Sequence, residues 1–206
     1  MGQIAMTDQE ILEQFADVVV ESLRIDRAKV TADAYLNDLG AESLDLLEIT
    51  METEDRFNIL MPQKNILQVA QEVFGEGVLV GDGRLTEEGM KLLRRRTPEV
   101  DRLLDDPTPA LADVSRMFLR VEVWIRMIRG LMEQSPRSCP KCDAAFGKAV
   151  AGRLKCAACG TECDIPSGDD LNRQWVLEYH QSVAERTAPH GAAVPAPAGA
   201  RAVTAS

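Results

Sequence analysis

The chain has 206 residues, of which 45% are hydrophobic and 27% are charged, a composition typical of one or two small soluble domains. Its formal net charge is -10, and no run of eighteen apolar residues is present, so we expect no membrane insertion. The first ten residues lack the basic start and apolar core of a secretory signal. The sequence therefore predicts a cytoplasmic protein whose five cysteines are reduced or metal-bound.

The negative charge is concentrated in the first third of the chain. Residues 1–74 contain fifteen acidic and five basic side chains, whereas residues 75–206 contain eighteen of each. An acidic module repels phosphate backbones and attracts basic protein surfaces, so nucleic acid is an unlikely partner for this part of the chain.

The first predicted helix covers residues 8–24, because apolar side chains recur there at helical spacing. Thr7 is a suitable N-cap, and Glu10 stands three residues later, as in a capping box. A loop follows over residues 25–40, and a loop of this length requires side chains that pack into the core. The anchors we expect are Val30, Tyr35 and Leu39.

The second predicted helix covers residues 43–57. We expect Leu44, Leu47 and Met51 to form its buried stripe, with Leu46 and Phe57 as further candidates. The predicted solvent face is acidic and comprises Asp45, Glu48, Glu52 and Asp55. Like charges at this spacing cost a few tenths of a kcal/mol per pair. Two interpretations therefore stay open for this face, a merely solvated surface or a surface that binds cationic partners.

Ser43 begins this second helix, and a serine in that position is usually a capping residue. The residues around Ser43 indicate a role beyond capping. The run Asp38-Leu-Gly-Ala-Glu-Ser-Leu44, the acidic and aliphatic helix, and then Phe57-Asn-Ile59 and Pro62 together resemble the prosthetic-group site of acyl carrier proteins. These motifs cover about residues 11–74, and the whole resemblance covers about residues 8–133.

The resemblance implies that Ser43 carries a 4′-phosphopantetheine arm whose thiol holds an acyl group as a thioester. It also implies as partners a phosphopantetheinyl transferase and enzymes that load, condense and transfer acyl groups. The implied partner-binding residues are Glu42, Asp45, Glu48, Glu52 and Asp55. Glu42 departs from the family, which usually has Asp before the modified serine, so we expect slower modification or a need for a dedicated transferase, rather than no modification.

A third helix is predicted over residues 64–74, and beyond it the pattern departs from an ordinary carrier protein. The glycine-rich residues 75–83 lack the Gly-Lys-Ser/Thr ending of a phosphate-binding loop and are interpreted as turns. A helix over residues 85–96 follows, with Thr86 as a possible cap, and residues 105–109 break the chain again.

A long helical pattern returns over residues 114–132. Its segment Leu119-Arg-Val-Glu-Val-Trp-Ile125 is similar to the last helix of carrier proteins. Residues 75–117 would then be a helical insertion between the third and last helices of an acyl-carrier-like four-helix bundle spanning residues 7–133. Arginines accompany this pattern and either pair with the acidic first third or bind a partner: Arg116, Arg120, Arg126 and Arg129.

Four cysteines in two Cys-x-x-Cys pairs predict a tetrahedral zinc site. The ligands are Cys139, Cys142, Cys156 and Cys159, and thirteen residues separate the two pairs. An iron–sulfur site, a redox pair or unrelated thiols are the alternatives. Cys163 is interpreted as a spare thiol. We expect a small β zinc ribbon over residues 136–166 that depends on its metal for folding and serves as a structural or docking module.

One more helix is predicted over residues 169–186, followed by a disordered tail over residues 187–206. His180 is interpreted as a surface or packing residue, His190 lies in the predicted disordered tail, and no set of residues for nucleophilic or acid–base catalysis is discernible. The sequence thus predicts a mainly α, non-catalytic carrier of acyl thioesters for fatty-acid, polyketide or related biosynthesis. The alternative is an unmodified carrier-like adaptor whose zinc ribbon binds protein or nucleic acid.

Overall fold

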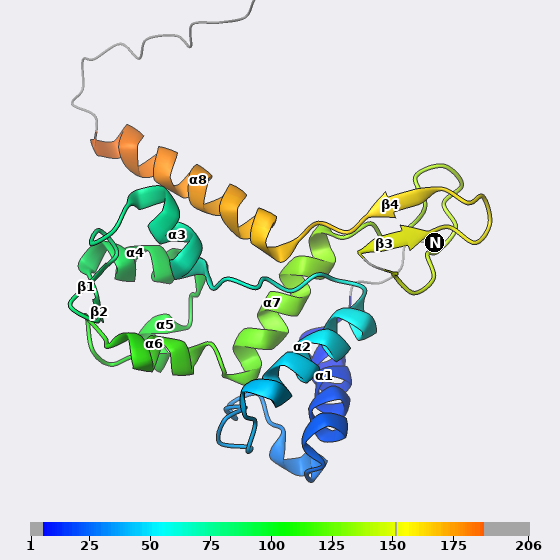
Figure 1. The fold of residues 1–206 in the computed structure, drawn as a ribbon, viewed down its shortest axis with the longest axis horizontal. Coiled ribbons are helices and arrows are strands. Elements are labelled where there is room, and N and C mark those ends of the chain that lie inside the picture. The colour runs from blue at the N-terminus through cyan, green and yellow to red at the C-terminus, as the bar shows by residue number, and fades with distance from the viewer. Residues whose placement is uncertain (1–5, 151, 188–206) are drawn as a thin grey trace, which may run out of the picture.

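The structure, a computed structural model, describes residues 6–150 and 152–187 and is mainly helical, with two small two-stranded antiparallel sheets (Figure 1). In chain order its elements are α1 (Asp8–Leu23), the 3-10 helix η1 (Arg27–Lys29), α2 (Ser43–Phe57), α3 (Ile66–Phe74), β1 (Val80–Gly81), β2 (Arg84–Leu85), α4 (Glu87–Arg96), α5 (Val100–Leu103), α6 (Leu111–Met117), α7 (Val121–Gln134), β3 (Arg153–Lys155), β4 (Glu162–Asp164) and α8 (Gly168–Thr187). Within the described ranges, no helix combines the length and the apolar character that crossing a membrane requires. The predicted disordered tail lies outside the described residues from position 188 onward.

The first hydrophobic core lies where α1 packs against α2 and α7. Helix α1 begins with the predicted capping box, in which Thr7 and Glu10 satisfy each other's backbone N–H groups. The buried ring of Phe15 stacks on Trp124 of α7 with the ring centroids 5.3 Å apart. Aromatic burial of this kind dominates the energetics of a small core, so α7 is an integral part of the unit that α1 and α2 begin.

Helix α2 has the predicted bounds, but its buried face is not the predicted one. The side chains of Leu44, Leu47 and Met51 are 80%, 57% and 59% exposed, respectively. The prediction that these three residues form the buried stripe is therefore wrong. They form instead an apolar strip on the outside of the helix, which we call the outer strip.

The face of α2 that enters the core carries Ile49, Thr53 and Phe57, spaced four residues apart. The hydroxyl of Thr53 is buried, and it donates a hydrogen bond to the carbonyl oxygen of Ile49 at 2.6 Å, so no polar group is left unpaired there. Leu46 is partly buried against the same core. Periodicity alone could not separate the two faces, because both carry apolar residues at helical spacing.

A second hydrophobic core is built by α3, the β1–β2 hairpin, α4, α5, α6 and α8. Helix α3 lies beside α8 (Figure 1), and its buried residues belong to this second core. Those residues are Ile66, Leu67, Val69 and Ala70. The arrangement differs from the predicted four-helix bundle, in which the third helix shares a core with the first, second and last.

The segment after α3 follows the predicted pattern of turns and then a helix. Residues 75–83 form turns and one strand of the β1–β2 hairpin, and Thr86 caps α4 by accepting a hydrogen bond from the N–H of Gly89 at 3.1 Å. A Cβ atom at Gly89 would lie 2.3 Å from the carbonyl oxygen of Leu79, which explains why glycine occupies this position.

The helical pattern predicted over residues 114–132 is divided between α6 and α7. In the gap, the carbonyl oxygen of Leu119 accepts a hydrogen bond from the N–H of Leu36, and the N–H of Val121 donates to the carbonyl oxygen of Ala34, both at 2.9 Å. Backbone groups that pair with another segment are not available for helical hydrogen bonds, so the helix breaks where the loop before α2 is attached.

The connection between α2 and α3 runs along the start of α8. Leu60 forms a parallel bridge with Ser167, and the N–H of Gly168 donates to the carbonyl oxygen of Leu60 at 3.0 Å. A Cβ atom at Gly168 would lie only 2.5 Å from the backbone nitrogen of Pro62. Helix α8, predicted over residues 169–186 and observed over Gly168–Thr187, is thus held against the chain on both sides of α3.

Candidate functional site

Ser43 is the first residue of α2, and its side chain is exposed. The N-cap is the preceding residue, Glu42, whose backbone N–H donates to a carboxylate oxygen of Asp45 at 2.7 Å. Asp45 therefore satisfies the backbone N–H of Glu42 at the start of α2, and the side chain of Ser43 takes no part in this cap.

The hydroxyl of Ser43 makes no hydrogen bond within the described part of the chain, which removes the interpretation of this serine as a capping residue. The true caps behave differently. Thr7, Asn65 and Thr86 each accept a hydrogen bond from a backbone N–H in the first turn of α1, α3 and α4. Ser43 therefore presents a free hydroxyl to solvent at the positive end of a fifteen-residue helix.

The loop before Ser43 is held by α6 as well as by the first core. The carboxylate of Asp38 accepts a hydrogen bond from the guanidinium of Arg116 at 2.7 Å, and that guanidinium lies over the ring of Tyr35. Of the predicted anchors, Val30 is buried and Tyr35 and Leu39 are half-buried. Sequence inspection missed Leu36, which is completely buried and sits beside Tyr35.

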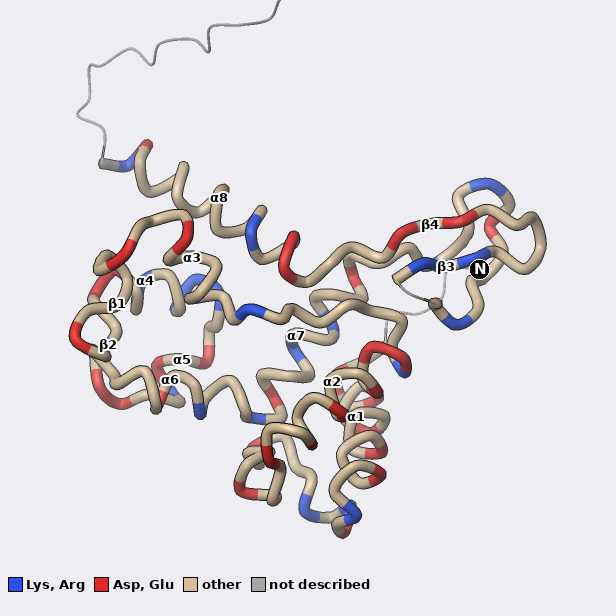
Figure 2. Tube along the Cα trace, in the orientation of Figure 1, with Lys and Arg blue, Asp and Glu red and all other residues tan. Residues whose placement is uncertain are grey.

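The acidic side chains of α2 flank the outer strip. Glu48, Glu52 and Asp55 are exposed, as predicted, whereas Asp45 is half-buried because it takes part in the helix cap. Figure 2 shows acidic residues along both α1 and α2. Exposed apolar side chains bordered by charges of one sign are a common form of protein-docking surface.

The four arginines of the α6–α7 region are engaged within the chain. Arg116 pairs with Asp38 and Arg129 pairs with Asp8, both in the acidic first third. The other two find partners nearer in sequence, since Arg120 pairs with Glu122 and Arg126 with Glu99. Two of the four arginines therefore pair with the acidic first third of the chain, as one of the two interpretations predicted, and the other two pair with acids outside it.

The sulfur atoms of the four predicted ligands converge. The Sγ atoms of Cys139, Cys142, Cys156 and Cys159 all lie within 4.8 Å of one another, and three of the pairs are 3.5 Å apart. Zinc–sulfur bonds of about 2.3 Å in a tetrahedron place the sulfurs about 3.8 Å apart, so the cluster has the dimensions that zinc requires. Cys163 stands outside it, on β4 opposite Leu154 of β3.

Each cysteine pair is held by the same backbone turn. The N–H of Asp143 donates to the carbonyl oxygen of Cys139 at 2.8 Å, and the N–H of Gly160 donates to that of Cys156 at 2.9 Å. Asp143 and Gly160 both have positive φ angles, which the turn requires. Two matching turns aimed at one point are consistent with a preformed four-sulfur site.

The thiols are not equivalent in acidity. Hydrogen bonding by the side chain and backbone of Thr161 lowers the pKa of Cys159 to about 6. For Cys142, the backbone N–H of Ala144 acts to lower the pKa, but the neighbouring sulfurs of Cys159 and Cys156 raise it to about 12. Crowded sulfurs oppose the formation of several thiolates, and a bound dication is what stabilises all of them together.

The segment of residues 136–166, which carries the cysteines and which we call the cysteine-bearing segment, also contacts the C-terminal end of α2. The sequence did not indicate this contact. Nζ of Lys148 pairs with Asp55 at 2.8 Å, and the N–H of Ala149 donates to Oδ1 of Asn58 at 2.8 Å. Asn58 ends α2 in the left-handed conformation. One member of the acidic face is therefore occupied from within the chain.

Comparisons with known proteins find matches to the part of the chain that contains α2 and Ser43. A family model described as "Phosphopantetheine attachment site" matches residues 13–72. An acyl carrier protein of Guillardia theta is 42% identical over 66 residues, which is 32% of this chain and 82% of that protein. Acyl carrier proteins of Lactobacillus johnsonii and Akkermansia muciniphila are 38% and 42% identical over 74 and 60 residues, covering 35% and 29% of this chain and 90% and 75% of those proteins. No solved structure matches.

The free serine at the head of α2 and the matched segment define a phosphopantetheine carrier module in the first third of the chain. The chain belongs to the acyl carrier protein family. That family is generally non-catalytic. The four-cysteine segment and most of the second core lie outside the matched residues.

The contact between the cysteine-bearing segment and α2 can be tested at Asn58. In both Asn58→Ala and Asn58→Gly, the amide of Ala149 should lose its protection from hydrogen exchange, because its acceptor is removed. Asn58→Ala should in addition lower the free energy of unfolding by about 1–2 kcal/mol, because alanine is strained in the left-handed conformation of this position. Asn58→Gly should not have this added loss, because glycine tolerates that conformation. The amide of Cys156, bonded to Thr161, is the internal control. Unchanged exchange at Ala149 would contradict the contact.

Proposed function

We propose that the chain is a carrier whose Ser43 bears a 4′-phosphopantetheine arm and which presents acyl thioesters to enzymes of fatty-acid, polyketide or related biosynthesis. The observation that carries the proposal is the exposed hydroxyl of Ser43, free of hydrogen bonds within the described residues, at the N-terminus of α2. The first partner would be a phosphopantetheinyl transferase, followed by loading, condensing and acyl-transferring enzymes. We also propose that the chain acts in the cytoplasm.

The residues around Ser43 fit such a group. A phosphate on this hydroxyl would lie at the positive end of the α2 dipole, where backbone N–H groups of the first turn have no helical partner. The side chain of Glu42 is exposed directly before Ser43, where its carboxylate would help organise the magnesium of an incoming transferase. When attached, the arm supplies the thiol chemistry, while the chain supplies only the position of its attachment point.

The docking surface we propose combines the outer strip with the acidic residues of α2. The residues assigned to partner binding are Glu42, Asp45, Glu48, Glu52 and Asp55, to which the structure adds Leu44, Leu47 and Met51. The acidic groups would steer a basic enzyme surface toward Ser43, and the apolar side chains would be buried in the complex. A partner that uses Asp55 must displace Lys148.

We propose further that Cys139, Cys142, Cys156 and Cys159 bind one zinc ion. The dimensions of the sulfur cluster and the two matching turns support this assignment. The ion would hold together residues 136–166 as a structural or docking module beside a carrier unit of residues 7–133, with its insertion at about residues 75–117.

A second candidate function is an adaptor that has lost modification and uses the cysteine-bearing segment to bind protein or nucleic acid. The contact of Lys148 with Asp55 favours this candidate, because it shows the segment engaged with the face that partners would use. Intact mass after coexpression with a broad-specificity phosphopantetheinyl transferase separates the two candidates.

Modification at Ser43 is the first prediction. The parent chain should gain the mass of one arm, Ser43→Ala should gain none, and Ser115→Ala, which removes another exposed serine, should be modified normally. Glu42→Asp should be modified faster if the longer side chain is a handicap. Peptide mapping that places the arm on a different serine, or finds no arm with several transferases, would exclude the carrier function.

The docking surface is tested by charge reversal. Glu48→Lys combined with Glu52→Lys should lower the association rate with the transferase by about tenfold at low ionic strength, and added salt should reduce the difference. Glu76→Lys, which reverses an exposed acid outside α2, is the matched control. Equal rates for the parent and the α2 variant would mean that the acidic face is merely solvated.

Zinc binding is tested by metal analysis of protein purified without chelator, which should give one zinc per chain. Cys156→Ser should lose the metal, and Cys163→Ser should retain it. Removing the metal should unfold the ribbon, whose apolar core is small, and should leave the core of α1, α2 and α7 and the modification of Ser43 in place. Modification must be assayed after the magnesium required by the transferase is restored. A zinc content far below one would contradict the assignment.

A further inference from the structure

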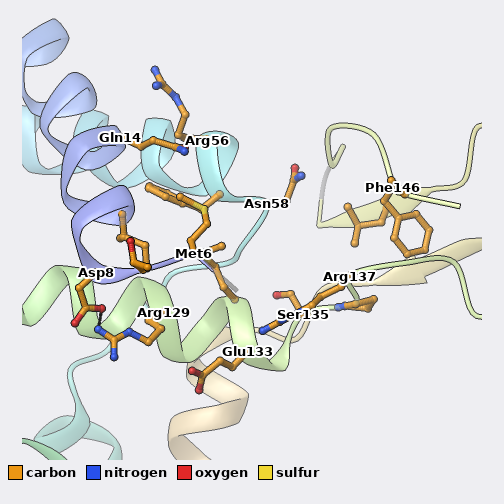
Figure 3. A pocket seen from close by; sticks show the side chains of 17 residues that line it. Met6, Asp8, Gln14, Arg56, Asn58, Arg129, Glu133, Ser135, Arg137 and Phe146 are labelled. Atoms are coloured by element: carbon orange, nitrogen blue, oxygen red, sulfur yellow. Dashed lines mark ion pairs between the residues drawn. The ribbon is translucent and has the colours of Figure 1, made fainter. Parts of the chain in front are cut away.

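A cavity of about 650 Å³ opens at the end of α2 that is opposite to Ser43. Its walls come from the N-terminal part of α1, the C-terminal ends of α2 and α7, and the cysteine-bearing segment (Figure 3). The volume falls within the usual range for small-molecule sites. Neither the serine nor the sulfur cluster takes part in the lining.

Apolar atoms make up the larger share of the cavity lining, and its accessible apolar side chains include Met6, Met132 and Phe146. Ile11 of α1, Phe57 of α2 and Leu154 of β3 are lining residues that are nearly or completely buried. Phe146 adds an aromatic ring from the cysteine-bearing segment, and Met132 adds a flexible side chain from α7. Such walls favour a hydrocarbon chain and offer nothing to a small hydrated ion alone.

The charged residues of the cavity lining have an excess of one cation, although the chain as a whole carries a net charge of -10, and one of the arginines, Arg56, already pairs with Asp17 and Glu21. The charged lining comprises Arg56, Arg129 and Arg137 against Asp8 and Glu133. Within the described residues Arg137 forms no ion pair. Nε of Arg129 is buried and donates no hydrogen bond there, even though the same guanidinium pairs with Asp8. An anionic head group at the mouth of the cavity would supply the missing acceptor.

The cavity is separate from the attachment site of the arm. Ser43 begins α2 and Phe57 ends it, and the helical rise of 1.5 Å per residue puts them about 21 Å apart. The buried face of α2 leads toward the cavity, whereas the outer strip lies on the outside of the helix. A ligand here is therefore bound independently of the cargo on the arm.

We propose that this cavity binds a free long-chain carboxylate, with its head group at Arg137 and Arg129 and its chain against Met6, Met132 and Phe146. The accessible apolar lining, the absence of an ion pair at Arg137 within the described residues and the unsatisfied Nε of Arg129 together carry the assignment. The same chemistry could be presented by an anionic lipid in a bilayer, which the experiment distinguishes. The site does not require the proposed carrier function, because no residue of the Ser43 region lines it.

The test is calorimetric titration of palmitate, below its micelle concentration, into the zinc-loaded full chain carrying Ser43→Ala, so that no arm or thioester can form. We expect saturable binding of one palmitate. Butyrate, inorganic phosphate and uncharged hexadecanol should each bind at least about tenfold more weakly, because each lacks either the chain or the charge.

Two variants locate the binding. Arg137→Glu should weaken palmitate binding at least about tenfold, and Ala145→Trp should block the cavity without changing its charge. Arg95→Glu, an exposed arginine of α4 outside the cavity, should bind like the parent. Zinc content and circular dichroism check that each variant is folded.

Palmitate binding that both cavity variants leave unchanged would overturn the proposal. Equal affinity for inorganic phosphate would reduce the site to an anion patch. Binding to phosphatidylglycerol vesicles without binding of free palmitate would assign the mouth to a membrane surface instead. Each of these results is independent of whether Ser43 is modified in the parent chain.

Discussion

Helix α2 has two apolar faces and can bury only one of them, and the rest of the structure follows from that choice. Helix α1 packs on the face with Ile49 and Phe57, and α7 packs on α1 in the same core. Leu44, Leu47 and Met51 are then left in solvent beside the acidic side chains, and Ser43 is directed outward at the head of the helix. The burial of one face of α2 thus leaves exposed both Ser43 and the surface that partners would contact.

Residues between α3 and α7 pack with α3 and α8 in a second core, apart from the core of α1, α2 and α7. Helix α3 leaves the first core to pack with α4 and α8, and the paired backbone between α6 and α7 returns the chain to the loop before Ser43. Arg116 reinforces that return through Asp38 and Tyr35. Residues at the end of α6 therefore contribute to holding the serine loop even though they are far from it in sequence.

The cysteine-bearing segment is the third component, and it touches the carrier unit at the end of α2 farthest from the serine. Its contacts through Lys148 and Ala149, and the cavity it shares with α1 and α7, make it part of the carrier's surface. Surface ion pairs of this type contribute about 0–1 kcal/mol each. The contact can thus be displaced by a partner at little cost.

Local patterns in the sequence determined the bounds of α1, α2 and α8 to within one residue at each end, and they also determined the cysteine geometry. The cap at Thr7, the start of α2 at Ser43 and the two Cys-x-x-Cys turns all depend on neighbours a few residues away, so they could be predicted. Three features could not be predicted: the buried face of α2, the packing of α3 in the second core, and the contact of Lys148 with Asp55. Each depends on which segments compete to cover an apolar surface, and helical spacing is the same for a face that meets another helix and one that meets water. Only the tertiary structure decided those three, because packing partners distant in sequence set the outcome.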